Sequence, residues 1–84
     1  MVIVAKKQIG VVSDYFKKIG VAAIKLTGAL KVGDEIHIKG ATTDFEQKVN
    51  SVQIDKNKVE KAKRGDEVGI KVKDRVRKDD KVFL

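Results

Sequence analysis

The stretch Glu35-Ile36-His37-Ile38-Lys39 alternates strictly between polar and apolar side chains. Successive side chains of a β-strand point to opposite faces, so this alternation predicts a strand with its two isoleucines inward and its three polar side chains in solvent. The next four residues, Gly40-Ala41-Thr42-Thr43, are typical of a turn. Residues 35–43 are therefore predicted to form a half-buried strand that ends in a turn.

The remaining sequence favours more strands of the same kind. Thirteen Val and eight Ile stand against three Leu, and β-branched residues favour strands over helices. In residues 45–54 the apolar positions change parity, which predicts a bulge near Asn50-Ser51. The basic residues 55–64 are predicted to form a loop. Five further strands are predicted at residues 2–12, 19–26, 45–54, 67–72 and 81–84.

Six short strands without a helix predict an all-β fold. Closing such a sheet into a small barrel removes its exposed edges, so we expect a six-stranded closed β-barrel. The chain has 84 residues, no Pro and no Gly-rich linker, which indicates one domain over residues 1–84.

A weak internal repeat marks three turns. Residues 31–36, 63–68 and 77–82 share a basic residue, a turn, an acid and then an apolar residue. Each copy predicts a turn that leads into a strand. In the Gly-Asp-Glu copies, we expect the Asp to cap the turn by side-chain hydrogen bonding and the following acid to face solvent.

The net charge of +7 favours a polyanionic partner, and RNA or the ribosome is our first expectation. A solvated ion-pair surface of the thermophilic kind explains the same charge equally well. The short apolar start of the chain is far below the length of a membrane span, so we expect a cytoplasmic protein with no membrane partner.

The residue inventory argues against catalysis. The chain has no Cys and a single histidine, His37, and it lacks the glycine-rich phosphate loops of nucleotide sites. We therefore expect no enzyme activity, no cofactor, no metal and no small-molecule substrate.

One segment combines aromatic and basic side chains. Tyr15 and Phe16 could stack on bases while Lys17 and Lys18 neutralise phosphates. Alternatively, Phe16 plugs the mouth of the barrel. A nucleic-acid surface would extend from these four residues to basic residues in the turns. The full predicted set is Tyr15, Phe16, Lys17, Lys18, Lys31, Lys39, Lys63 and Arg64.

Four blocks carry a family resemblance, at residues 14–24, 30–38, 49–53 and 62–70. With the motifs Lys31-Val32-Gly33-Asp34-Glu35-Ile36 and Ala62-Lys63-Arg64-Gly65-Asp66-Glu67-Val68-Gly69, the chain resembles domain 2 of the translational GTPases of the elongation factor Tu and initiation factor type. The likeness covers about residues 9–84. It implies a Greek-key barrel that contacts RNA, the ribosome or a translation-factor partner.

The resemblance leaves other functions open. The chain lacks the Gly-Arg pair of elongation factor Tu at residues 23–28, so the aminoacyl-tRNA pocket is not carried over. Because the GTPase domain is absent, a protein partner or a homodimer could cover the docking surface. Related barrels also end certain collagenase-like peptidases. The alternatives are thus a protein-protein adaptor barrel and a separately encoded accessory domain of such an enzyme.

Overall fold

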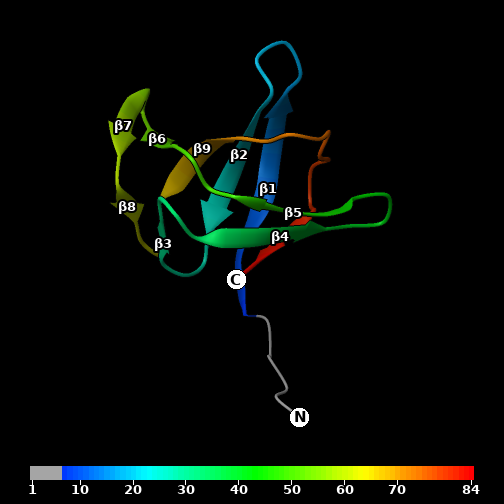
Figure 1. Cartoon of the computed structure of the whole chain (residues 1–84), viewed down its shortest axis with the longest axis horizontal. Coiled ribbons are helices and arrows are strands. Elements are labelled where there is room, and N and C mark those ends of the chain that lie inside the picture. Colours follow the sequence, from blue (N-terminus) through cyan, green and yellow to red (C-terminus); the bar gives the residue numbers. More distant parts are fainter. Residues whose placement is uncertain (1–6) are drawn as a thin grey trace.

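The computed structural model describes residues 7–84 and shows an all-β fold without helices (Figure 1). The predicted start of the first strand, residues 2–6, lies outside the described residues. The strands are β1 Gln8–Phe16, β2 Val21–Leu26, β3 Leu30–Lys31, β4 Glu35–Lys39, β5 Asp44–Lys48, β6 Val52–Ile54, β7 Asn57–Val59, β8 Lys61–Ala62, β9 Glu67–Lys71 and β10 Lys81–Phe83.

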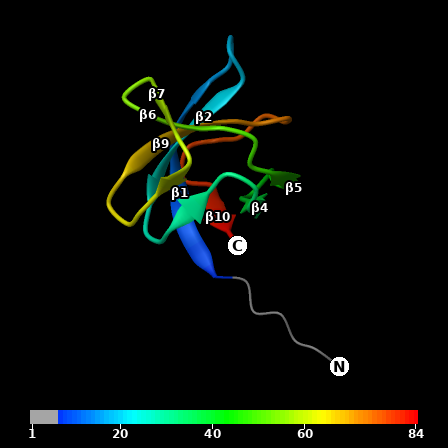
Figure 2. The ribbon, with the colours of Figure 1, turned by 60° about the vertical axis from the view of Figure 1, so that its left-hand side comes forward.

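Eight strands form one antiparallel sheet in the order β5-β4-β10-β1-β2-β9-β6-β7. The short strands β3 and β8 form a separate two-stranded sheet, seen at the left of Figure 1. In Figure 2 the β6–β7 pair and the β4–β5 pair of the large sheet lie on opposite sides of the molecule. Within residues 7–84, the end strands β5 and β7 do not pair with each other. The predicted all-β class is therefore confirmed, whereas the backbone ladder does not close the large sheet into a barrel.

The predicted strands differ in how well they match the structure. The strand predicted at residues 35–39 coincides with β4. His37 was expected in solvent but is half-buried: its side chain hydrogen-bonds with Asp44, and the centres of the His37 and Phe83 rings lie 6.5 Å apart. The single strand predicted for residues 45–54 is two strands, β5 and β6, separated where the change of parity predicted a bulge. The loop predicted for residues 55–64 contains β7 and β8, and β3 was not predicted.

One continuous hydrophobic core lies on the inner face of the sheet. Ile36 and Ile38 are inward as predicted, and they pack in one cluster with alternate residues of β2 and β9 and with Ile9 and Val12 of β1. The side chains of Val49 and Val52 are both buried although they lie on either side of the parity change. The break between β5 and β6 thus keeps both halves of this segment facing the same core.

Three turns repeat one hydrogen-bonding pattern, which the sequence predicted for the two Gly-Asp-Glu copies. The Oδ2 atoms of Asp34, Asp66 and Asp80 accept a bond from the backbone nitrogen three residues earlier, at 3.0, 3.0 and 2.8 Å. The residue before each Asp has a positive φ, which explains glycine in two of the copies. The third copy has Asp79 there, with a φ of 76°.

Each turn is also fastened to a buried residue of another part of the chain. Val49, Leu26 and Val12 each exchange two backbone hydrogen bonds with the last two residues of the 31–34, 63–66 and 77–80 turns, at 2.8–3.0 Å. These three apolar residues are buried in the core. Each turn is therefore held by its own Asp side chain and by two backbone hydrogen bonds to a core residue. These contacts fix the start of the strand that follows the turn.

Candidate functional site

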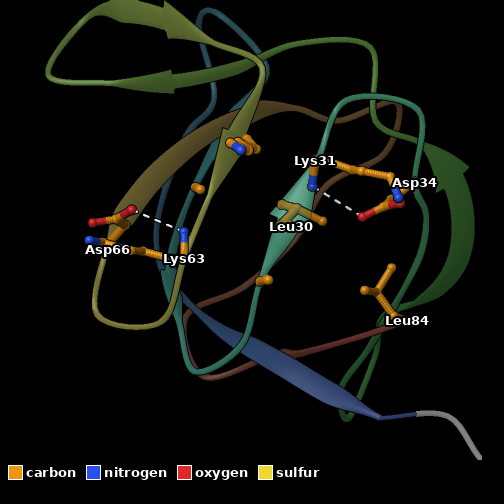
Figure 3. Close-up of a pocket in the computed structure, with 9 residues that line it drawn as sticks. Leu30, Lys31, Asp34, Lys63, Asp66 and Leu84 are labelled. Carbon is orange, nitrogen blue, oxygen red and sulfur yellow. Dashed lines mark hydrogen bonds and ion pairs between the residues drawn. The ribbon is translucent and has the colours of Figure 1, made fainter.

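A groove lies over the small sheet formed by β3 and β8 (Figure 3). Its volume is about 690 Å³. The apolar side chains of Ala29, Leu30, Ala62 and Leu84 form its floor, and charged side chains stand at its rim. The rim residues are Lys31, Asp34, Lys61, Lys63 and Asp66.

Two of the repeated turns form the opposite ends of this groove. β3 leads into the 31–34 turn and β8 leads into the 63–66 turn. In Figure 3 the two dashed bonds from the Lys31 and Lys63 backbone nitrogens to Asp34 and Asp66 lie on either side of Leu30. The groove is thus bounded by rigid turns.

The two halves of the groove are related by an approximate two-fold axis. Leu30 pairs with Ala62 in the antiparallel ladder, and such a pair has local two-fold symmetry. An axis through this pair places Lys31 onto Lys63 and Asp34 onto Asp66. The sequence repeat is therefore visible as symmetry in the lining of the groove.

The rim carries both signs of charge, but the carboxylates are engaged. Asp34 caps its own turn and lies 3.7 Å from the Lys31 ammonium, and Asp66 caps the second turn. The Lys31 side chain is 71% exposed, against 17% for Asp34. The ammonium groups are consequently the rim groups that a ligand reaches most easily. An apolar floor with polar edges is typical of a ligand-binding site.

The predicted nucleic-acid residues do not form one site. Lys31 and Lys63 come together at the groove, and Arg64 lies beside Lys63 in the same turn. Lys39 lines a separate depression next to Gly40. The other four predicted residues lie along the end of β1 and in the turn that follows it.

The end of the β1–β2 hairpin contradicts the barrel-plug alternative. Phe16 is 47% exposed and points out of the core, whereas Tyr15 is partly buried and packs against the core. Strand β1 continues through Phe16, beyond the predicted end of the first strand at residue 12, so the tip of the hairpin is formed by residues 17–20. Lys17 and Lys18 lie in this tip.

Sequence reasoning missed the floor of the groove. Leu30 and Ala62 lie directly before the two matching turns, so the repeat does contain a signal for them. That signal becomes meaningful only through the β3–β8 pairing, which joins residues far apart in the chain.

Solved structures share this fold almost completely. The C-terminal domain of a Geobacillus thermoleovorans protein assigned to the U32 peptidases superposes with a TM-score of 0.89, over 93% of this chain and 99% of that one, at 21% identity. The fold is that of a U32 peptidase C-terminal domain. A second crystal structure of that domain gives a TM-score of 0.84 at 22% identity and covers 88% of this chain and 86% of that one.

Curated proteins match this chain in sequence as well. An uncharacterised protease of Methanocaldococcus jannaschii is 46% identical over 94% of this chain, and a collagenase of Porphyromonas gingivalis is 40% identical over 93% of it. The chain spans about a fifth of the length of these relatives, 20% and 22%. No protein-family profile matches the chain.

These comparisons correct the sequence-based identification. The relatives are a protease and a collagenase, so the resemblance to translational GTPases and the expectation of an RNA or ribosomal partner are wrong. The names of these relatives also contradict the expectation of no enzyme activity. The eight predicted residues are not tested as a nucleic-acid surface and stay a prediction. No part of residues 7–84 forms a helix able to cross a membrane.

Proposed function

We propose that this chain is an accessory domain of a U32-type, collagenase-like peptidase and that its groove holds a segment of the peptide substrate. The observation that carries the proposal is the 46% identity to a stretch of a protease over 94% of the chain. This was the alternative expected from the sequence.

The groove has the properties that a peptide-binding site needs. Its volume of about 690 Å³ falls in the range of ligand sites. Ala29 and Leu84 are exposed and offer an apolar surface to a hydrophobic side chain, and the lysines at the rim can donate hydrogen bonds to peptide carbonyls. Because Lys31 and Lys63 are related by the approximate two-fold axis, both should contribute about equally to binding.

Filling the groove with a larger side chain tests this proposal. Ala29 is exposed and lines the groove, so Ala29→Trp should block binding while leaving the core unchanged. Ala41→Trp is the matched control, because Ala41 is also exposed and lies away from the groove in the turn between β4 and β5. The probe is a set of fluorescein-labelled peptides from gelatin, chosen because two relatives are named collagenases.

We expect Ala29→Trp to weaken peptide binding about tenfold in fluorescence anisotropy, which corresponds to the loss of one well-buried apolar contact. Ala41→Trp should bind as the unchanged protein does. If the two variants bind equally well, the peptide does not occupy the groove.

We further propose that the chain is one domain and that its sheet closes into a Greek-key barrel through a side chain. The Gln47 amide on β5 donates to the Lys71 carbonyl at 2.8 Å and accepts from the Lys73 backbone nitrogen at 2.9 Å. These are the two bonds that a neighbouring strand would supply. The amide thus supports closure between β5 and the end of β9, where the backbone ladder is interrupted.

Removing this amide should loosen the contact between β5 and the end of β9. Gln47→Met keeps the length of the side chain and loses both hydrogen bonds, so the free energy of unfolding should fall by about 1–2 kcal/mol. Hydrogen exchange at the Lys73 amide should also become faster. Gln53→Met, the same change at a half-buried residue on β6, is the control. Unchanged exchange at Lys73 would argue against closure through Gln47.

A further inference from the structure

A second pocket lies between the end of β5 and the end of β9, and it shares no lining residue with the groove. Its volume is about 460 Å³. It is lined by Gln47, Lys48, Asn50, Ser51, Lys71, Val72 and Lys73.

Two lysines of this pocket, Lys71 and Lys73, are positioned by the hydrogen bonds of the Gln47 amide. Lys71 and Lys73 flank Val72, whose side chain is turned into the core and is only 8% exposed. In an extended segment, residues on either side of an inward residue both point outward. The Gln47 amide binds the backbone of both lysines, which fixes their spacing.

One ammonium group is further restrained by an aromatic ring. The Lys73 Nζ atom lies 5.9 Å from the centre of the Phe45 ring, within the range of a cation–π contact. This contact holds the Lys73 ammonium near β5, the strand that also carries Lys48. The three lysines therefore approach the pocket from two sides.

The pocket differs from the groove in its charge. None of its seven lining residues is Asp or Glu, while two carboxylates line the groove. In residues 7–84, the ion pairs Lys31–Asp34 and His37–Asp44 both lie outside the pocket. The Asn50 amide and the Ser51 hydroxyl add hydrogen-bond donors to the three positive charges.

We propose that this pocket binds an oxyanion, through Lys48, Lys71 and Lys73 as charged donors with Asn50 and Ser51 beside them. Bringing three like charges together is unfavourable, and a bound anion relieves the repulsion while accepting charge-assisted hydrogen bonds. The anion is either inorganic phosphate or the paired carboxylates of an acidic peptide, because both offer several oxygens to such donors. The site goes beyond the proposed peptide groove and does not depend on it.

The test is a pair of titrations of the whole chain at constant ionic strength, one with sodium phosphate and one with a tetraglutamate peptide. Amide chemical shifts of Ser51, Lys71 and Lys73 report on the pocket. The variant replaces Lys48, Lys71 and Lys73 with glutamine. Its control replaces Lys25, Lys56 and Lys58, three exposed lysines outside the pocket, so the change in net charge is the same.

We expect saturable shifts confined to the pocket, and an affinity that falls about tenfold in the pocket variant but less than about twofold in the control. Binding of phosphate alone identifies a small anion as the ligand, and binding of tetraglutamate alone identifies acidic side chains. The proposal is overturned if neither anion gives saturable shifts in the unchanged protein, or if both variants lose affinity equally.

Discussion

We expect Gly40→Ala to lower the free energy of unfolding by about 3 kcal/mol, which is a large effect for the addition of one methyl group. A Cβ atom at this position would stand 1.8 Å from Asp80 Oδ1 and 2.6 Å from its Cγ. The Asp80 side chain is buried, and its other oxygen is bound to the Arg77 backbone nitrogen at 2.8 Å. The carboxylate therefore cannot swing away, and either the 77–80 turn or the end of β4 must shift.

A double-mutant cycle with Asp80→Ala tests this cause. If the clash with the carboxylate is responsible, Gly40→Ala should cost much less in a protein that already carries Asp80→Ala. Urea unfolding followed by circular dichroism measures the four proteins of the cycle. Fully additive losses would show that Gly40 is required for another reason.

Asp80→Ala should cost about 2–3 kcal/mol, because it leaves the Arg77 backbone N–H without its acceptor in a region shielded from water. Asp80 is 5% exposed. Asp34 and Asp66 make the same cap but lie nearer to solvent, so water can replace their carboxylates. Asp34→Ala and Asp66→Ala should each cost only about 1 kcal/mol.

The three equivalent turns serve as controls for one another. Chemical denaturation of the three single variants should rank Asp80→Ala as the most destabilising, with the other two alike. Equal losses at all three positions would mean that burial does not set the strength of the cap. Asp80→Asn, which keeps an acceptor oxygen, should recover part of the loss.

The features that the sequence predicted well depend on neighbouring residues. Strand β4 and the three Asp-capped turns follow from alternation and from short-range side-chain bonds, which a local pattern contains. Strands β3, β7 and β8 have only two or three residues each, too few to show a period. The closure that we propose for the sheet depends on Gln47, whose partners lie 24 and 26 residues away. No local signal marks such a contact.

The same distinction explains the mistaken family. The motif around Gly33 and the motif around Gly65 are what a capped turn with a positive φ requires, so unrelated proteins with such turns can share them. Lys31 and Lys63 were predicted as binding residues because of charge, and both do line the groove. Its apolar floor was missed because it forms only when β3 and β8 pair.

Peptide binding in the groove over β3 and β8 is tested most directly by a chemical-shift map of the chain, with unlabelled gelatin-derived peptide added to the isotope-labelled protein. We predict that the largest amide shifts fall on residues 29–34 and 61–66, at both ends of the groove. Saturable shifts that fall elsewhere, with these two segments unchanged, would contradict the account.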